Sequence, residues 1–267
     1  MIMSVKELFN MKNRVVIITG AAGLLGSQYA NVLSQYGANV VLADVKYSEC
    51  KKIEKELISK YGVSPLSIKL DLTNPKSIKS MISKILKKYS KIDVLINNAA
   101  DQGNPKLRTT KFEDFPLSYW NKALNVNLTG VFLCCQEVGK VMVKQKKGNV
   151  INISSTYGLV APDQRIYGNS GQNSAVFYSA TKSALLNLTR YLASYWNGTG
   201  IRVNTLSPGG VEKNQNATFI KKYSEKTMLG RMAYKDEYNG AILFLASDAS
   251  SYMTGSNLIV DGGWTAW

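Results

Sequence analysis

Short runs of apolar, mostly β-branched residues alternate along this chain with longer segments in which apolar residues recur at helical spacing. The short runs are typical of buried strands, and the longer segments are typical of amphipathic helices. The predicted strands are 15–18, 39–43, 66–70, 92–96, 149–153, 201–206 and 257–260. The predicted helices lie near 24–36, 48–61, 75–89, 117–145, 177–197, 216–223 and 236–247.

This alternation of strands and helices indicates βαβ units around a parallel sheet. Because such crossovers are right-handed, we predict a Rossmann-type α/β fold: a doubly wound, parallel, seven-stranded sheet with helices on both faces. No linker, repeat or low-complexity tract divides residues 1–267, so the chain is predicted to form a single domain. Its ligand crevice should lie at the carboxyl ends of the strands.

A glycine-rich turn follows the first predicted strand and opens a helix. It reads Thr19-Gly20-Ala-Ala-Gly23-Leu24-Leu25-Gly26. Glycine lets the backbone approach a ligand closely, and the unpaired N–H groups and dipole of the helix start can hold a pyrophosphate. We therefore predict that Gly20, Gly23, Leu24, Leu25 and Gly26 bind a dinucleotide.

Asp44 stands at the tip of the second predicted strand, 24 residues after Gly20. A carboxylate there would take the adenosine ribose hydroxyls and repel a 2′-phosphate. The glycine turn carries no Lys or Arg, although Lys46 would soften the repulsion. The sequence thus favours NAD over NADP as cofactor; the alternative is that Asp44 is an ordinary surface turn residue.

The chain has no histidine, which excludes Ser-His and Cys-His catalysis and His-based metal sites. Tyr178 and Lys182, one helical turn apart, offer another proton carrier, because an adjacent ammonium favours the phenolate and lowers the pKa of the tyrosine. The same spacing in Tyr47 and Lys51 falls in a lysine-rich, solvated segment. Tyr178 instead opens an apolar helix, where burying the charge of a lysine costs free energy and so indicates a functional role.

Charge and cysteine content bear on partners and location. There are 33 basic and 18 acidic residues, for a net charge of +15, which can mark nucleic-acid binding. Only 6 of the basic residues are Arg and the Lys are dispersed along helices, so we expect solvated lysine faces and no nucleic-acid partner. Three cysteines, no secretory signal and no apolar stretch approaching a membrane span predict a cytoplasmic protein without a metal site or membrane contact.

Assembled in order, the motifs resemble those of the short-chain dehydrogenase/reductase family of the classical type, from about residue 10 to the C-terminus. They are Thr19-Gly20 to Gly26, Asp71-Leu72, Asn97-Asn98-Ala99-Ala100, Asn127, Ile151 to Ser155, Tyr178 to Lys182, Asn204 to Gly209 and Asp261-Gly262-Gly263. Segments 157–167 and 208–215 are also similar to dehydrogenases of bacterial surface-sugar pathways, including those of nonulosonic acids.

The resemblance implies catalytic roles for four residues. Tyr178 would be the general acid/base, and Lys182 would lower its pKa and hold the nicotinamide ribose. Ser155 would polarise the substrate carbonyl, with Ser154 as the alternative. Asn127 would position a water for proton relay, or make an ordinary helix contact.

The resemblance also implies cofactor contacts beyond the glycine turn. Asp71 would contact the adenine ring, Val211 would contact the carboxamide, and Asn97 would line the cleft. The other implied contacts are Leu72, Asn98, Ala99, Ala100, Pro208 and Gly209, besides Tyr178 and Lys182. The chain departs from the family pattern at Gly23-Leu24, at Ala100 in place of glycine, and at Lys213 in place of a threonine.

Ser155 and Tyr178 lie 23 positions apart, more than is usual in the family, so an insertion is predicted at about 161–177. Its hydrogen-bonding residues suit a polyhydroxylated substrate, because a site built for hydroxyls leaves unpaired groups without them. A solvated surface loop is the equal alternative. A lid at about 212–231 adds basic residues that could meet a phosphate or carboxylate, so an anionic sugar or polyol is one option for the substrate.

Together these features predict an NAD(H)-dependent oxidoreductase that interconverts a secondary alcohol and a ketone on a sugar- or polyol-like substrate. The alternatives are a non-catalytic dinucleotide-binding scaffold, a sugar epimerase or dehydratase with tightly bound NAD, and a nucleic-acid-binding protein. The family implies a homodimer or homotetramer. The Trp264–Trp267 tail suits a contact between subunits, or packing within one subunit.

Overall fold

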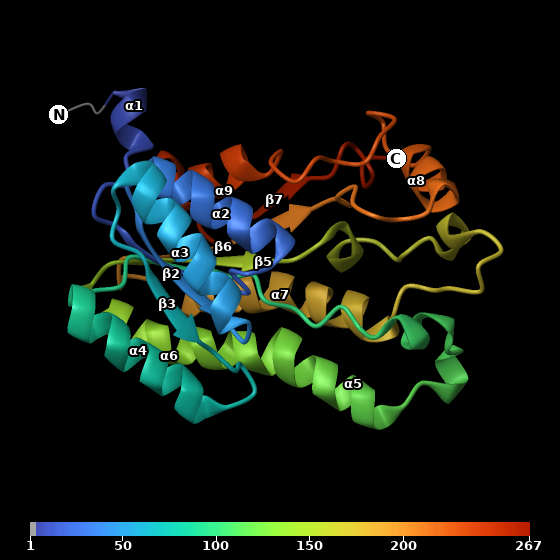
Figure 1. The fold of residues 1–267 in the computed structure, drawn as a ribbon, viewed down its shortest axis with the longest axis horizontal. Coiled ribbons are helices and arrows are strands. Elements are labelled where there is room, and N and C mark those ends of the chain that lie inside the picture. The colour runs from blue at the N-terminus through green and yellow to red at the C-terminus, as the bar shows by residue number, and fades with distance from the viewer. Residues whose placement is uncertain (1–3) are drawn as a thin grey trace.

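The computed structural model describes residues 4–267; residues 1–3 of the predicted domain lie outside the described residues. One parallel sheet organises the chain, in the strand order β3-β2-β1-β4-β5-β6-β7 (Figure 1). Its strands are β1 (Val15–Thr19), β2 (Asn39–Asp44), β3 (Leu66–Lys69), β4 (Val94–Asn97), β5 (Gly148–Ile153), β6 (Ile201–Pro208) and β7 (Asn257–Val260). The predicted doubly wound, seven-stranded Rossmann-type fold is confirmed.

Helices cover both faces of the sheet, as predicted (Figure 1). One face carries α2 (Leu24–Gln35), α3 (Tyr47–Tyr61) and α9 (Asn239–Ala246). The other carries α4 (Pro75–Tyr89), α6 (Gly130–Gln145) and α7 (Val176–Tyr195), with α5 (Leu117–Leu124) leading into α6. The remaining helices are α1 (Val5–Leu8) and α8 (Ala217–Ser224).

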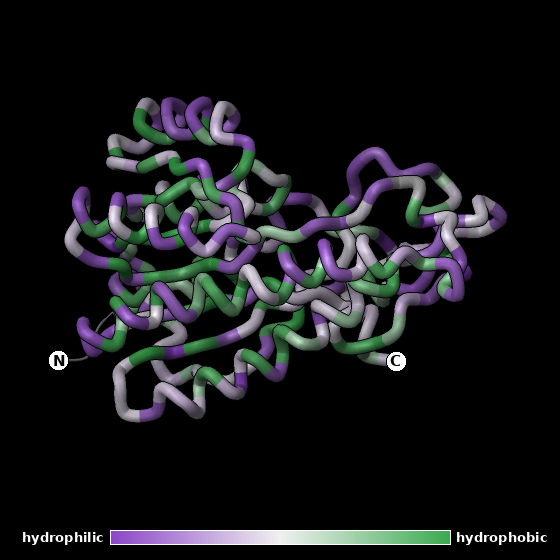
Figure 2. The backbone as a smooth tube through the Cα atoms, turned by 90° about the horizontal axis from the view of Figure 1, so that it is seen from below, coloured by the Kyte–Doolittle hydropathy of each residue, from purple (hydrophilic) through white to green (hydrophobic). Residues whose placement is uncertain are grey.

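The core is divided by the sheet into two apolar layers, because successive strand residues point to opposite faces. In β1, Ile17 packs toward α4 and α6, while Val16 and Ile18 pack toward α2 and α9. All three are fully buried, as expected for a strand covered on both faces. In Figure 2 the tube is hydrophobic along the central strands and more hydrophilic along the outer helices.

The fourth strand begins two residues later than predicted. Ile92 is fully buried, but its backbone N–H and carbonyl bond the side chain of Gln145, at 3.0 and 2.8 Å. The Asp93 carboxylate accepts from the backbone N–H of Val15 at 2.8 Å. Apolar burial therefore extends beyond the ladder, because side chains satisfy the backbone that the neighbouring strands do not.

Residues 117–145 form one helical segment interrupted by a π-helical turn at Asn125–Thr129. By length and composition alone this segment qualifies as a candidate membrane span, contrary to the prediction from the sequence. In the fold, 44% of its most apolar window is buried. Its apolar residues have a partner within the fold: Cys134, Cys135 and Val138 are buried against α4 and the sheet. It is a core helix of this domain.

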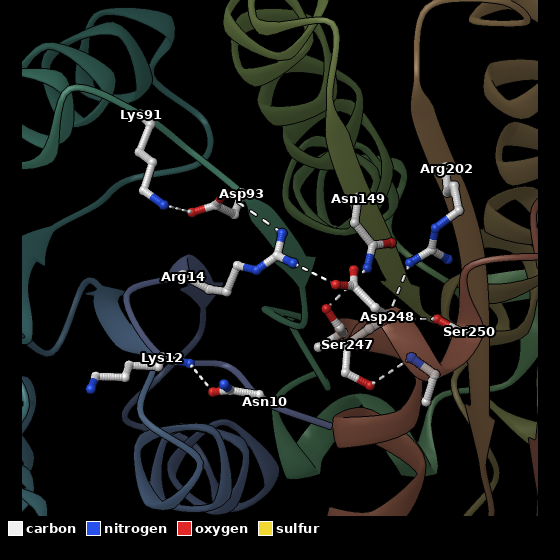
Figure 3. Close-up of polar contacts among 12 residues, drawn as sticks. Asn10, Lys12, Arg14, Lys91, Asp93, Asn149, Arg202, Ser247, Asp248 and Ser250 are labelled. Atoms are coloured by element: carbon white, nitrogen blue, oxygen red, sulfur yellow. Dashed lines mark hydrogen bonds and ion pairs between the residues drawn. The ribbon is translucent and has the colours of Figure 1, made fainter. Parts of the chain in front are cut away.

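The amino edge of the sheet is closed by ion pairs. The Arg14 guanidinium lies between two carboxylates, 2.7 Å from Asp248 and 4.0 Å from Asp93, and Lys91 pairs with Asp93 at 2.9 Å (Figure 3). Arg202 donates to the carbonyls of Ser247 and Met253. These charges are occupied with one another, so this edge is structural and the chemistry must be sought at the opposite edge.

A chain of buried polar side chains crosses the core beneath α7. The Asn97 amide donates to Asn152 Oδ1 at 2.9 Å, and the Asn152 amide donates to Thr189 Oγ1 at 2.9 Å. The Thr205 hydroxyl donates to the same Thr189 oxygen at 2.7 Å. These bonds join β4, β5 and β6 to α7 at a fixed position along and around the helix.

Candidate active site

The residues singled out from the sequence gather at the carboxyl edge of the sheet. Thr19 and Asp44 end β1 and β2, and Asn97 and Pro208 end β4 and β6. Ser155 follows β5 by two residues. Since all seven strands are parallel, their carboxyl ends share one edge, where open α/β sheets bind ligands.

The glycine turn brings bare backbone to this edge. Gly20 has φ +67°, and a Cβ there would lie 2.7 Å from the Ala99 Cα. A Cβ at Gly26 would meet the Gly20 carbonyl. Gly23 begins α2 without a side-chain cap, so the N–H groups of the first turn of this 12-residue helix are not occupied by a capping side chain. The turn therefore fits the pyrophosphate of a dinucleotide.

Two predicted cofactor residues hold this turn in place. The Asn98 amide donates to the carbonyls of Thr19 and Gly20 at 3.0 and 3.1 Å. Thr19 Oγ1 accepts from the backbone N–H groups of Asn98 and Ala99 at 3.0 and 3.1 Å. The side chain of Asn98 is thus committed to shaping the turn. Ala100, half-buried, follows in the same loop.

Asn97, which the resemblance placed in the cleft, points the other way. It is 2% exposed, and its amide donates to Asn152 and to Cys135 Sγ in the core. Its strand position explains the difference, because Asn97 is the last residue of β4 and its side chain projects into the layer beneath α6. Asn97 supports the sheet and does not line the cleft.

The Asp44 carboxylate lies against the glycine turn. Oδ2 accepts from the backbone N–H of Ala22 at 3.0 Å, and Oδ1 accepts from the backbone N–H of Lys46 at 2.9 Å. Residue 44 is half-buried. A negative charge is therefore fixed beside the pyrophosphate cradle, where the sequence predicted a ribose contact.

The Asp71-Leu72 pair serves two purposes. Asp71 is exposed, and its Oδ1 accepts from the backbone N–H and hydroxyl of Thr73 at 2.9 and 2.7 Å. Leu72 is 6% exposed and packs in the core against Gly130, where a Cβ would lie 2.8 Å from the Leu72 Cβ. The side chain of Asp71 remains accessible to a ligand, whereas that of Leu72 is a packing group.

The predicted catalytic residues meet where β5 ends and α7 begins. The Ser155 side chain lies near enough to the Tyr178 hydroxyl to lower the pKa of the tyrosine, and its oxygen accepts from the backbone N–H of Tyr157 at 3.2 Å. Lys182 Nζ lies 5.7 Å from the centroid of the Tyr178 ring and donates to the Ile153 carbonyl at 2.6 Å. Ser155, from the segment after β5, and two side chains of α7 thus lie close together.

Ser154 is excluded from this group by its own hydrogen bond. Its hydroxyl donates to the backbone carbonyl of Lys182 at 2.7 Å, and the side chain is 1% exposed. It ties β5 to α7 from within the core. Of the two neighbouring serines, Ser155 is the one whose hydroxyl faces Tyr178.

Burial governs the protonation of both groups in α7. Loss of water around Lys182, which is 4% exposed, lowers its pKa to about 8. Burial also raises the pKa of Tyr178, and the hydrogen bond from Ser155 and the charge of Arg108 oppose this rise. This direction is the reverse of the one that the sequence predicted, because exclusion of water from the phenolate outweighs the attraction of nearby cations.

Asn127 lies in the π-helical turn, 2% exposed, and its side chain is used twice. Oδ1 accepts from the backbone N–H of Asp101 at 2.6 Å, and the amide donates to the Asp101 carbonyl at 3.0 Å. Both ends of the amide thus hold the loop after β4. Because its side chain is occupied in holding this loop, a water at this position would have to hydrogen-bond backbone groups of the π-helical turn.

The loop after β6 passes beside the site. Gly209 donates its N–H to the Val260 carbonyl at 2.8 Å, and the Tyr238 hydroxyl donates to the Gly209 carbonyl at 3.0 Å. Val211 pairs with Ala233 in an isolated bridge. A cavity of about 130 Å³ opens between this loop and the lid. Its lining includes Gly209, Gly210, Tyr223, Thr227 and Asp261.

The predicted insertion, residues 161–177, contacts the predicted lid through a few side chains, while residues 161, 164–165 and 169–171 are exposed to solvent. Ile166 is 1% exposed, and the Tyr167 and Phe219 rings lie 5.3 Å apart. Asp163 pairs with Lys226 of the lid at 2.7 Å. The insertion and lid therefore form one wall beside Tyr178.

The two tryptophans of the C-terminal tail differ: one packs within the subunit, and the other is exposed. Trp264 is 7% exposed and stacks on Tyr223 with ring centroids 4.2 Å apart. Trp267 is 73% exposed, although its indole N–H donates to the Lys226 carbonyl at 3.2 Å. Trp264 belongs to the core of the lid, and Trp267 remains available to a partner.

Arg108 is a site residue that sequence reasoning missed. It lies in the 3-10 helix Pro105–Thr109, in the loop after β4, and its positive charge acts to lower the pKa of Tyr167 and of Tyr178. No motif marks it. Its place depends on the folding of a long loop against the insertion, where its carbonyl accepts from the N–H of Asn173 at 2.6 Å.

Within the described residues, 4–267, no group of three Cys, Asp or Glu side chains could hold an ion. Burial raises the pKa of the thiols of Cys50 and Cys135 to about 12, so these are inert core groups.

The lowered pKa of Lys182 predicts a pH-dependent stability. Its folded pKa is about 8, and its ordinary value is 10.5. Between these values the unfolded chain retains a proton that the folded protein has lost, so this contribution to the free energy of unfolding rises with pH. Between pH 7 and pH 10, we expect the free energy of unfolding of wild type to increase by about 2 kcal/mol relative to that of a Lys182→Met variant.

Urea unfolding of both proteins at the two pH values measures this difference. Tyrosines and lysines remote from Lys182 are present in both proteins, so their contributions cancel when the two free energies are subtracted. A difference that stays constant with pH would mean that Lys182 is not desolvated in the folded protein.

Comparison with known proteins places this geometry in a family. The family model described as Enoyl-(Acyl carrier protein) reductase matches residues 20–265. The post-translational flagellin modification protein A of Campylobacter coli is 33% identical over 95% of this chain and 99% of its own. The 3-oxoacyl-[acyl-carrier-protein] reductase FabG of Thermotoga maritima is 36% identical over 95% and 98%.

Further relatives are named for small polar substrates. The NAD-dependent glycerol dehydrogenase of Listeria innocua is 35% identical over 96% of each chain. A crystal structure of gluconate 5-dehydrogenase from Burkholderia cenocepacia, in complex with NADP and tartrate, superposes with a TM-score of 0.88 at 28% identity, covering 99% of this chain and 100% of that one. The chain belongs to the short-chain dehydrogenase/reductase family of NAD(P)-dependent oxidoreductases that act on CH–OH groups.

Proposed function

We propose that this protein interconverts a secondary alcohol and a ketone on a polyhydroxylated substrate, with NAD preferred over NADP. The observation that carries this proposal is the convergence of Ser155, Tyr178 and the buried Lys182 at the carboxyl edge, beside the glycine turn. Burying a lysine beside a tyrosine costs free energy of folding, and such groups are frequent at functional sites. Proton transfer at a carbon–oxygen bond would use this pair.

In this proposal Tyr178 exchanges a proton with the substrate oxygen, while Ser155 donates a hydrogen bond to that oxygen. Lys182 stabilises the ionised tyrosine through its charge, 5.7 Å from the ring centroid. Asn127 positions the loop that closes this side of the site. When bound, the nicotinamide accepts or donates the hydride.

The proposed cofactor rests on the fit of the glycine turn to a pyrophosphate. The turn supplies close backbone approach at Gly20, Gly23 and Gly26, and the start of α2 at Leu24 and Leu25 supplies N–H groups. Asp44 supplies the negative charge that favours ribose hydroxyls over a 2′-phosphate. Further proposed contacts at this edge are Asp71, Ala99, Ala100, Pro208, Gly209, Val211, Tyr178 and Lys182. Leu72 and Asn98 would contribute backbone groups, because their side chains are occupied.

A polar substrate is supported by the relatives and by the wall of the site. Among the relatives are dehydrogenases named for glycerol, threitol and mannitol. The predicted insertion brings Tyr167 near Tyr178, and its Asn173 donates its backbone N–H to the Arg108 carbonyl at 2.6 Å. We propose one domain over residues 1–267, in which the insertion at 161–177 and the lid at 212–231 border the substrate.

A second candidate substrate is a 3-oxoacyl group carried on a thioester. The relative from Thermotoga maritima, 36% identical, is named for that reaction, which uses the same change at carbon. The polar residues of the insertion favour the polyol class over this one, since an acyl chain would leave their hydrogen-bonding groups unpaired.

Exposed aromatic side chains support a homodimer or homotetramer. Tyr191 and Tyr195 stack on each other at 6.0 Å on the outer face of α7, 61% and 69% exposed. Tyr252 and Trp267 are likewise exposed near the C-terminus. We also propose a reducing, cytoplasmic location, which suits three buried free cysteines.

Titration with NADH and NADPH, followed by nicotinamide fluorescence, tests the cofactor proposal. We expect tighter binding of NADH, and NAD-linked absorbance change on at least one polyol or sugar in a panel that also holds a 3-oxoacyl thioester. Turnover of the thioester alone would move the substrate to the acyl class. NADH binding without turnover of any compound would favour a scaffold, and absence of binding would refute the reading of the glycine turn.

A further inference from the structure

The last residues of the chain fold back onto the lid, and the C-terminus lies near α8 (Figure 1). Two glycines at positive φ turn the backbone there, Gly262 at +67° and Gly263 at +85°. The Asp261 carboxylate fixes the turn, because it accepts from the backbone N–H groups of Gly263 and Thr265, both at 2.9 Å. The side chain of Trp264 is thereby held inside the molecule, 7% exposed.

The Trp264 ring contacts two tyrosines that belong to different parts of the site. It stacks on Tyr223 of α8, with ring centroids 4.2 Å apart and an interplanar angle of 28°. It also meets the ring of Tyr157 edge to face, with centroids 6.2 Å apart and an interplanar angle of 68°. One aromatic side chain thus joins the lid to the turn that follows β5.

Tyr157 leads from this ring to Ser155. The 3-10 helix Thr156–Gly158 follows Ser155 directly, and the Ser155 oxygen caps it by accepting from the Tyr157 N–H at 3.2 Å. A serine hydroxyl has one proton to donate, and a bond accepted by its oxygen restricts the direction of that proton. A shift of the Tyr157 backbone would therefore change how Ser155 donates to a substrate oxygen.

Tyr223 leads from the same ring to the loop after β6. Its hydroxyl accepts from the backbone N–H of Gly210 at 2.5 Å. A Cβ at Gly210 would lie 2.6 Å from the Tyr223 ring, so only glycine allows this close approach. The neighbouring residue, Gly209, is a proposed cofactor contact. The lid is thus bonded to a loop that borders the cofactor.

We propose that Trp264 is a positioning residue that holds the Ser155 turn and the loop after β6 at a fixed separation. The proposed reaction requires this separation, because Ser155 would bind the substrate oxygen while the loop after β6 would border the nicotinamide that exchanges the hydride. A displacement of about 1 Å between reacting groups can lower a rate by about 100-fold. The inference rests on the proposed function and adds to it a residue that touches neither substrate nor cofactor.

Hydrogen exchange at backbone amides, measured by mass spectrometry on the protein without ligand, tests this role without turnover. Trp264→Leu keeps an apolar side chain but removes the ring. We expect exchange of the Tyr157 and Gly210 amides, which bond Ser155 and Tyr223, to rise by about 10- to 100-fold. Exchange in β1, at Val15–Thr19, should stay as in wild type. Trp267→Leu makes the same change at the exposed tryptophan of the tail and should alter none of these rates.

Turnover gives a second measurement, which a purely structural role would not change. With the polyol of the panel that reacts fastest, Trp264→Leu should lower kcat by about 10- to 50-fold while the dissociation constant for NADH stays within about threefold of wild type. Cofactor affinity is retained because the glycine turn and Asp44 follow β1 and β2, and three strands, β4, β5 and β6, separate β1 from β7. Trp264→Phe keeps an aromatic ring and should restore kcat to within about fivefold of wild type.

Three results would overturn the inference. Equal acceleration of exchange in β1 would mean that Trp264 contributes only to global stability. Acceleration confined to the lid would mean that the ring does not restrain the Ser155 turn. An unchanged kcat in Trp264→Leu would separate the ring from the reaction.

A variant at the other end of the contact covers the case in which Trp264→Leu shows no cooperative urea transition and is therefore unfolded. Tyr157→Leu removes the same ring contact from a half-buried position. It should lower kcat and leave NADH binding intact, and a wild-type kcat would refute the inference. A wild-type protein that turns over no compound would count against the proposed function alone, since the exchange rates would still decide whether Trp264 joins the two loops.

Discussion

Replacing Tyr178 with phenylalanine is expected to lower kcat/KM by about 10³-fold while leaving the dissociation constant for NADH within about twofold of wild type. The ring is retained, so its contact with Lys182 and the packing at the start of α7 persist. What is lost is the hydroxyl that lies near Ser155 and would exchange a proton with the substrate. Initial rates with the best polyol of the panel, and a fluorescence titration, measure the two quantities.

Tyr191→Phe provides the matched control. Tyr191 stands on the same helix, 61% exposed, and stacks on Tyr195 away from the site. Its loss should leave both kcat/KM and NADH binding as in wild type. Unaltered turnover in Tyr178→Phe would remove Tyr178 from the reaction, and a parallel loss of NADH binding would point to a folding defect.

Replacing Asp44 with asparagine should shift the ratio of NADPH to NADH affinity by about 10- to 100-fold toward NADPH. The amide oxygen can still accept from the Ala22 N–H, so the glycine turn keeps that support. The charge that opposes a 2′-phosphate is gone. Because Lys46 follows two residues later, its ammonium would then act on the phosphate without opposition from Asp44.

Glu49→Gln removes the same charge from an exposed position at the start of α3, where Glu49 pairs with Lys52 at 3.0 Å. It should leave the cofactor ratio unchanged, because it lies away from the glycine turn. An unshifted ratio in Asp44→Asn would show that another residue reads the ribose. The two dissociation constants, measured by fluorescence for each variant, decide between these results.

Hydrophobic spacing alone located every strand and nearly every helix boundary within a few residues. The strand at Asn257–Val260 matches its prediction, and so does the helix Pro75–Tyr89. That helix has local signals at both ends, an Asn74 cap with Pro75 following, and Ser90 in a left-handed conformation. Such features act over a few residues, so a sequence pattern captures them.

Features that depend on distant residues were not predictable in this way. Ile92 reads as strand, but its backbone is satisfied by Gln145, 53 residues away. Asn97 and Asn98 are neighbours of the same type, yet one holds the core and the other holds the glycine turn. The direction of their side chains is set by the end of β4, and the family pattern treats them alike.

The electrostatic state of the site was the least predictable part. Sequence spacing placed Lys182 beside Tyr178, but the depth of burial decides whether a nearby cation outweighs loss of water. Arg108 is similarly invisible to spacing, because it arrives on a loop 70 positions before Tyr178. Both effects arise from the packing of loops that carry no helix or strand periodicity.

The buried polar chain beneath α7 has a consequence for how substrate range can change over evolution. Thr189 lies seven residues after Lys182, two helical turns along the same face, so its bonds to Asn152 and Thr205 set the orientation of Tyr178 and Lys182 together. The insertion ends where α7 begins and contributes nothing to those bonds. Its sequence and length can therefore change, and new substrates be acquired, without moving the helix that carries Tyr178 and Lys182.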